Sequence, residues 1–312
     1  MIRIIGARLV GIAVTLALLS FAMFLLIGLM PGDPIDLAIA GDPRLTAEDA
    51  ARLRALHGLD QPLTARYLAW VAALLRGEFG YSRLFAQPVA EVIAPALLST
   101  LILLGAALAL AGGIGLALGL LAAARPRAAP AVDVVAILGQ SAPSFWLGIL
   151  LIILFAVTLG WLPAGGAGEG GIADALRHLA LPVATLAIAN LAAYARHSAA
   201  ALGATLREPW VTAARARGNG EGRVMLRHAL PNAAVPILQV AALDAGALVG
   251  GALITETLFA HPGMGKLIYD AVMGNDTNLA LVALLLVALV TMLATLAADL
   301  AQRGLDPRLR DT

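Results

Sequence analysis

Long uncharged apolar runs alternate with short polar segments along most of this chain. The runs span residues 9–30, 92–124, 134–168, 178–195, 231–255 and 277–298, and the fifth is interrupted by a single acidic residue, Asp244. A transmembrane helix needs about 20 apolar residues to cross a hydrocarbon core about 30 Å thick. The pattern therefore predicts six transmembrane helices, the third of which ends near Leu159, in an all-α membrane protein.

The first run, which follows Arg3 and Arg8, has a second interpretation as a secretory signal peptide. The apolar part of a signal peptide is about 7–15 residues long and leads to a small-residue cleavage site. This run is longer and ends in the sequence "MPGDP" at 30–34, which favours a retained span. The predicted organisation is a first segment at 1–30, a long loop at 31–91 and a five-helix core at 92–312.

The long loop differs from the rest because charged residues are frequent in it. Thr46, followed by Glu48 and Asp49, is typical of a helix N-terminus, where acidic groups face the positive end of the helix dipole. Residues 62–76 place apolar and aromatic side chains at helical spacing, which predicts an amphipathic helix. Its aromatic residues suit a membrane–water interface, and simple packing against the helix bundle explains them equally well.

Arginine is distributed unevenly between alternate loops. The N-terminus, the 125–133 loop, the 196–230 loop and the C-terminus hold two, two, six and three arginines, whereas the opposite short loops hold only Arg177 and Lys266. Positive residues accumulate in cytoplasmic loops, and long loops such as 31–91 cross largely regardless of charge. We therefore expect both termini and the 196–230 loop to be cytoplasmic and residues 31–91 to lie outside the cytoplasm.

Composition excludes several classes of function. Of the 312 residues, 60% are hydrophobic and 13% are charged, against about 25% charged in a typical soluble domain. The net charge of +1 and the lack of interleaved aromatics in the 196–230 loop argue against a nucleic-acid partner. The chain has no cysteine, its five histidines show no metal-ligand spacing, and its one lysine, Lys266, is not in a phosphate-binding loop. We expect a protein that is not an enzyme and binds no metal or cofactor itself.

The 196–230 loop is too long for a simple connection between two spans. Residues 210–217 favour a helix that Gly218 ends by adopting positive φ, and a second short helix at 222–230 leads to Pro231, which closes the segment. Two short helices joined at a glycine form a knob that can dock into a groove of a partner. A solvated positive loop is the alternative, but it does not require this placement of glycine and proline.

This loop resembles the "EAA" motif of permeases from ATP-binding-cassette importers, E-A-A-x3-G-x9-I-x-L-P. The chain keeps the spacing, with Thr212 in place of the glutamate and His228 in place of the isoleucine. Its version, "AARARG…RHALPNA", is most similar to that of the first permease of dipeptide, oligopeptide and nickel importers. In that family the loop, here 203–232, couples to the ATPase, and the resemblance assigns that role to Thr212, Ala213, Ala214, Arg215, Arg217, Gly218, His228, Leu230 and Pro231.

The resemblance covers almost the whole chain. Six further motifs follow in family order: "PGDP" at 31–34, "GLDQP" at 58–62, "FGYS" at 79–82, "PSFWLG" at 143–148, "HLALP" at 178–182 and "TETLFAHPGMG" at 255–265. The chain departs from the family at Ala199 and Ala204, where relatives often carry an arginine and an acid, and at Asp244, where glutamine is expected. These departures bear on the substrate and on the fine coupling contacts.

The resemblance implies a six-span permease with the type I importer fold in a bacterial inner membrane. Its implied partners are a homologous second permease, two ATPase subunits that carry ATP and Mg²⁺, and an extracytoplasmic binding protein. Peptides are the expected substrates, with nickel chelates, glutathione or another small solute as alternatives. A rival class is a stand-alone channel or an ion-driven transporter, which usually has polar clusters at the bilayer midplane; a third is a signalling or assembly protein.

Asp244 is the candidate residue of the substrate pathway. A charge at membrane depth costs about 2.5–3.5 kcal/mol on insertion scales, so it is expected to face a cavity or a partner. It either lines the substrate path, pairs with an arginine of the partner permease, or lies near the bilayer edge.

Overall fold

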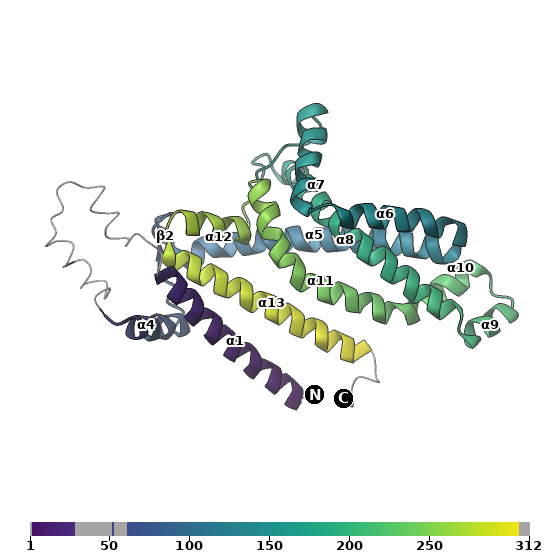
Figure 1. Ribbon diagram of the computed structural model, residues 1–312, viewed down its shortest axis with the longest axis horizontal. Coiled ribbons are helices and arrows are strands. Elements are labelled where there is room, and N and C mark those ends of the chain that lie inside the picture. The colour runs from purple at the N-terminus through teal and green to yellow at the C-terminus, as the bar shows by residue number, and fades with distance from the viewer. Residues whose placement is uncertain (1, 29–51, 53–60, 306–312) are drawn as a thin grey trace. The chain divides into compact units, whose positions relative to one another are not determined.

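A computed structural model describes residues 2–28, 52 and 61–305 of the chain, most of them in helices (Figure 1). The long elements are α1 (Ile2–Gly28), α4 (Leu63–Leu75), α5 (Val89–Ala124), α6 (Ala129–Ser141), α7 (Ser144–Leu151), α8 (Ile172–Leu206), α9 (Pro209–Ala216), α11 (Leu230–Leu258), α12 (Met264–Met273) and α13 (Thr277–Leu305). The short elements are α10 (Glu221–Arg223) and strands β1 (Tyr81–Ser82) and β2 (Gln87–Pro88). These elements form two compact units. The first comprises residues 97–266 and 290–305, and the second comprises residues 2–96 and 267–289.

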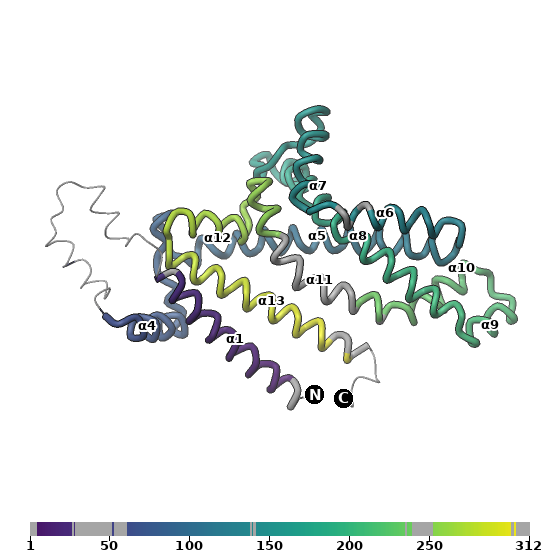
Figure 2. The backbone as a smooth tube through the Cα atoms, in the orientation of Figure 1, coloured from purple at the N-terminus to yellow at the C-terminus, as the bar shows by residue number. Residues whose placement is uncertain are grey.

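The first unit is organised around α8, which packs against α6, α7 and α11. Figure 2 follows α8 from its start near α7 to its end near α9. On α5, Gly115 and Gly119 face the backbone of α8, where a Cβ atom on either glycine would overlap the Cβ atoms of Tyr194 and Ser198 respectively. Such small residues allow two membrane helices to approach closely. Leu103, Ala107 and Leu186 bury the adjoining apolar contact between the two helices.

Four of the predicted spans are confirmed as long apolar helices. Among the described residues, Ile5–Leu26, Val89–Ala124, Ile172–Leu206 and Thr277–Leu300 have the length and composition to cross a membrane. The helix predicted at 178–195 is longer at both ends, reaching Leu206. The span predicted at 231–255 is the 29-residue helix α11.

The span predicted from Val134 to about Leu159 is not one continuous helix. The chain forms α6 up to Ser141, leaves helical geometry at Ala142 (φ −97°, ψ 133°), and begins α7 after Pro143. The residue before a proline is driven out of the α region by the proline ring, which explains the break. A π-helical segment, Ile152–Thr158, extends α7, and together they form a shorter apolar helix, Ser144–Thr158.

In the second unit, α4 confirms the amphipathic helix predicted at 62–76. It packs on α1 through an aromatic cluster in which the ring of Tyr67 meets Phe21 edge-on, with 5.1 Å between centroids. The rings of Trp70 and Phe24 lie 5.9 Å apart and are tilted by 44°. The hydroxyl groups of Tyr67 and Ser20 are 2.9 Å apart. The helix start predicted at Thr46 lies outside the described residues.

The same unit fixes the "FGYS" segment by buried hydrogen bonds. Strands β1 and β2 form an antiparallel hairpin, and the hydroxyl of Ser82 donates to Asp276 Oδ2 at 2.6 Å. Asp276 also accepts the backbone N–H groups of Leu84 and Leu279, the second from the first turn of α13. The aspartate thus caps α13 and holds the hairpin at its start.

Candidate coupling site

Helix α9 is short and has defined ends. Glu208 precedes it in extended conformation, and Pro209 occupies the first helical turn. Proline suits this position because a backbone N–H there would have no hydrogen-bond partner within the helix. At the other end Gly218 has φ of +81°, and its N–H donates to the carbonyl of Arg215 at 2.9 Å. The side-chain amide of Asn219 donates to the carbonyl of Ala214 at 2.9 Å. The predicted helix and its glycine stop are therefore present, and Asn219 is a cap that sequence reasoning missed.

One face of α9 packs against its own chain. Val211 and Ala214, three residues apart, are 0% and 1% exposed. A separate buried cluster joins the end of α8 to residues 224–229 and the start of α11 through Leu202, Met225, Ala229 and Ala233, with Leu120 of α5 packed against it. Ala214 is therefore small because it lies inside the permease.

The opposite face of α9 is exposed. Trp210, Ala213 and Arg217 follow one another at helical spacing, and Thr212 lies beside them. Arg217 stays close to the helix, since its Nε donates to the carbonyl of Ala213 at 3.2 Å. From the exposed residues of α9 and its C-terminal cap, we define the knob face as Trp210, Thr212, Ala213, Ala216 and Arg217. It offers an apolar and basic surface with small residues at its centre.

An ion pair closes the turn after α9. Arg215 donates from Nε to Glu221 Oε1 at 2.8 Å and from Nη2 to Oε2 at 3.1 Å. The hydrogen bond from Arg215 lowers the pKa of the Glu221 carboxyl, and the same bond raises the pKa of the guanidinium. The two residues are six apart and meet only because Gly218 reverses the chain. Glu221 is thus a second residue that the sequence did not identify.

The second part of the knob departs from the prediction. Instead of a separate helix that Pro231 closes, α10, a π-helical segment at Val224–Ala229 and α11 follow without interruption, so the chain is helical from Glu221 to Leu258. Pro231 lies in the first turn of α11, directly after the π-helical segment, and so does not end the helical stretch.

The other predicted site residues fall in two places. In the π-helical segment and the start of α11, His228 and Leu230 are half-buried and Pro231 is exposed. Asp244 is within α11, and its side chain lies outside the described residues. Its role stays a prediction.

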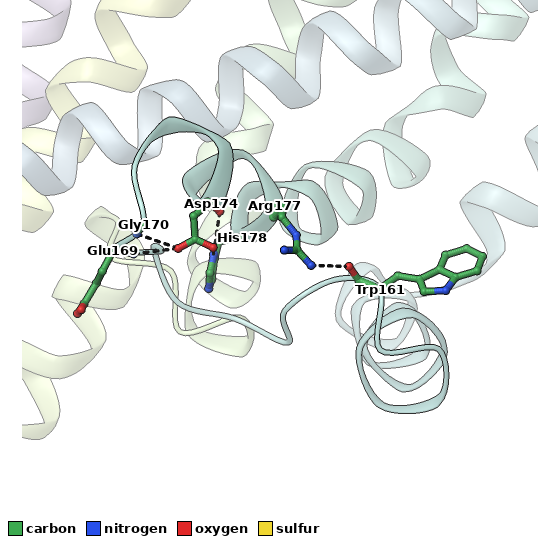
Figure 3. A network of polar contacts seen from close by, with 6 residues as sticks. All are labelled: Trp161, Glu169, Gly170, Asp174, Arg177 and His178. Atoms are coloured by element: carbon green, nitrogen blue, oxygen red, sulfur yellow. Dashed lines mark hydrogen bonds and ion pairs between the residues drawn. The ribbon is translucent and has the colours of Figure 1, made fainter.

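A polar network secures the loop before α8 (Figure 3). Asp174 Oδ2 accepts the backbone N–H groups of Glu169 and Gly170 at 3.0 and 3.1 Å, and His178 Nδ1 lies 2.9 Å from the carbonyl of Asp174. Arg177 donates to the carbonyl of Trp161 at 3.0 Å. These bonds fold the glycine-rich loop 160–171 onto the first turn of α8, at the opposite end of that helix from α9.

The fold and site define a multi-pass helical membrane protein with an exposed helical knob. Residues 115–311 match the family described as binding-protein-dependent transport system inner membrane component, and residues 1–99 match its N-terminal companion. The chain belongs to this family. A chain of the MetNI methionine ABC transporter in an inward-facing conformation has the same fold, with a TM-score of 0.59 over 70% of this chain and 98% of that one, at 20% identity.

Full-length relatives agree with this assignment. The chain is 31% identical to the oligopeptide transport system permease AppB of Bacillus subtilis, with 98% of each chain covered. It is 35% identical to the di/tripeptide permease DppB of Pseudomonas aeruginosa and 36% identical to the glutathione permease GsiC of Escherichia coli, each over 99% of both chains. The protein is therefore a permease subunit of an ATP-binding-cassette importer.

Proposed function

We propose that this permease forms half of a peptide pathway through a bacterial inner membrane. A homologous second permease supplies the other half, two separate ATPase subunits supply the energy, and an extracytoplasmic binding protein delivers the substrate. Family membership supports this general assembly. The observation that carries the coupling step is the knob: α9 is anchored on its inner face by Val211 and Ala214 and leaves its outer face open.

Di- and oligopeptides are the proposed substrates. Two of the relatives compared above are named for oligopeptides and for di- and tripeptides, which supports a peptide substrate. The third is named for glutathione. Nickel chelates, glutathione and other small solutes are the alternatives, and uptake assays distinguish them.

The knob face is the proposed contact with the ATPase. Thr212, Ala213 and Gly218 are exposed, so added volume at these positions would press into a docked partner, whereas Ala214 supports the knob from inside. Overfilling a packed contact typically costs about 1–3 kcal/mol. Arg215 is engaged by Glu221, which makes it a support of the turn, and Arg217 is the exposed cation of this face. ATP and Mg²⁺ bind to the partner subunits in this scheme.

Asp244 is proposed to face the translocation path, where it meets the ammonium group of a peptide. The proposal rests on the cost of a charge at membrane depth. Asp244→Asn is expected to impair uptake and to leave assembly with the ATPases intact. Unchanged transport kinetics for every accepted substrate would remove Asp244 from the path.

The test is reconstitution. The permease is co-expressed with its candidate second permease and ATPases, purified through a tag on this chain alone, and placed in liposomes with the binding protein. We expect ATP-dependent uptake of a labelled dipeptide, competed by unlabelled peptides more strongly than by nickel or glutathione. Uptake driven by an ion gradient without ATP would contradict the proposal, as would purification of the chain without any ATPase.

A further inference from the structure

A fully buried carboxylate lies near the end of α11. Glu256 is 0% exposed, and its Oε1 accepts a hydrogen bond of 2.6 Å from the hydroxyl of Thr100 on α5. Its Oε2 accepts the backbone N–H groups of Gly265 and Lys266, at 2.6 and 3.3 Å, in the first turn of α12. Burying a carboxylate is costly unless donors replace its hydration, and a helix N-terminus supplies such donors. One side chain thus joins three helices.

Two glycines allow the chain to close around this carboxylate. A Cβ atom on Gly263 would overlap the carboxylate of Glu256, and one on Gly265 would overlap the backbone of Leu253. The hydroxyl of Thr100 also accepts the N–H of Met264 at 2.7 Å, so it bonds to α11 and α12 at once. Close packing and donor placement together account for most of the "TETLFAHPGMG" motif.

A second contact strengthens the same place. His261 Nε2 lies 2.8 Å from the hydroxyl of Ser99, the neighbour of Thr100 on α5. The N–H of Gly166 donates to the carbonyl of Phe259 at 2.8 Å, which attaches the loop before α8. We call this set, Ser99, Thr100, Glu256 and residues 259–266, the Glu256 junction.

The Glu256 junction is at the opposite end of the helix that starts in the knob. The chain is helical from Glu221 to Leu258, so the residues after the Arg215–Glu221 turn and the junction belong to one continuous helical segment. The knob and the junction are therefore connected by one helical segment, which includes a π-helical stretch and Pro236. The hydrogen bonds of the junction are the contacts that tie the end of α11 to α5 here, in addition to the packing of α11 on α8 and α7.

We propose that Glu256 is a positioning residue of the transport cycle, which fastens α11, α5 and α12 so that their ends move as one body when the knob is displaced. This proposal rests on the proposed coupling function. It assigns no contact between Glu256 and substrate.

The first test measures relative movement at the junction. Because the chain has no cysteine, nitroxide labels can be attached at Leu101→Cys on α5 and Ile254→Cys on α11, two exposed positions beside the junction. Dipolar spectroscopy on the assembled transporter should give one narrow distance that is the same without nucleotide and after trapping with ATP, Mg²⁺ and vanadate. A distance that changes between these states in the otherwise wild-type protein would overturn the proposal.

The second test separates positioning from simple stability. Thr100→Ser keeps the hydroxyl, whereas Thr100→Val keeps the shape and removes it. Losing a hydrogen bond to a charged group should lower the equilibrium constant for the fastened junction by about tenfold, or about 1.4 kcal/mol. Thr100→Val should therefore lower the amount of substrate transported per ATP hydrolysed. It should also broaden the 101–254 distance, and Thr100→Ser should restore both. Wild-type coupling and a narrow distance in well-folded Thr100→Val would refute the role of the junction.

These outcomes are distinguishable from failure of the proposed function. If the permease does not assemble with ATPases, the coupling function fails, and the 101–254 distance in the nucleotide-free permease still reports whether Thr100 fastens the helices. If the wild type transports and hydrolyses ATP normally but Thr100→Val does so equally well, only the junction proposal fails.

Discussion

At the scale of single residues, Gly218 and Gly220 look alike in sequence and differ in backbone. Gly218 has φ of +81°, whereas Gly220 has φ of −65° and ψ of 151°. A Cβ atom at either position would meet nothing within 4 Å. Any difference between alanine variants at the two positions therefore reports backbone conformation and not crowding.

Gly218→Ala is expected to destabilise the permease and Gly220→Ala is not. An L-residue in the left-handed region costs about 1–2 kcal/mol, while an exposed change in ordinary geometry stays within about 0.5 kcal/mol. Thermal unfolding of the two purified variants measures this, and the amount of ATPase that co-purifies shows whether the turn matters for docking. Equal stability and equal docking would show that the positive φ is unimportant.

His261 gives the permease a pH-dependent contribution to stability. Burial lowers the pKa of its imidazole below the usual 6.5. The folded state thus binds this proton more weakly than the unfolded state. The contribution of His261 to the free energy of unfolding is therefore fully present above about pH 6.5 and is lost as the pH falls toward the lowered pKa. His261→Gln should flatten the fall in melting temperature between about pH 7.5 and pH 5.5. His197→Gln, at an exposed position of α8, is the control. If it flattened the pH dependence of the melting temperature as much as His261→Gln does, the effect could not be assigned to the buried His261.

At the scale of elements, the turn after α9 depends on two opposite charges. Arg215→Glu and Glu221→Arg should each weaken ATPase docking because like charges then face each other across the turn. The double variant restores the pair and should recover docking, most clearly at low salt, where exposed ion pairs are least screened. Co-purification of the ATPase in the four combinations measures the coupling between the two sites. A double variant no better than either single one would mean that Arg215 acts on the partner instead.

The helices were predictable from the sequence where long uncharged runs specify them, as for α1, α5 and α13. The stop at Gly218 was also predictable, because a glycine after a helix-favouring segment is a local signal. The break at Pro143 had a local signal too, but a long apolar run on both sides concealed it. The pairs Arg215–Glu221 and Thr100–Glu256 were not predictable, since the first needs the turn geometry and the second joins residues 156 apart.

At the scale of the whole molecule, the arginine distribution predicts on which side of the membrane each loop lies. Single cysteines at Ala213 and at Leu75 are both exposed and are the first thiols in the chain. An impermeant maleimide added to intact spheroplasts should label Leu75→Cys, and should label Ala213→Cys only after lysis. Labelling of Ala213→Cys from outside would invert the topology and exclude contact of the knob with a cytoplasmic ATPase.

Site-specific photocrosslinking can capture the contact that we propose between the knob face and an ATPase. A photoreactive amino acid replaces Thr212 on the knob face or, as a control, Leu75 on α4, and the assembled transporter is irradiated in the membrane. We predict a covalent product of permease and ATPase from position 212 and none from position 75. An intact complex that gives no product from position 212, or gives the same product from position 75, would contradict it.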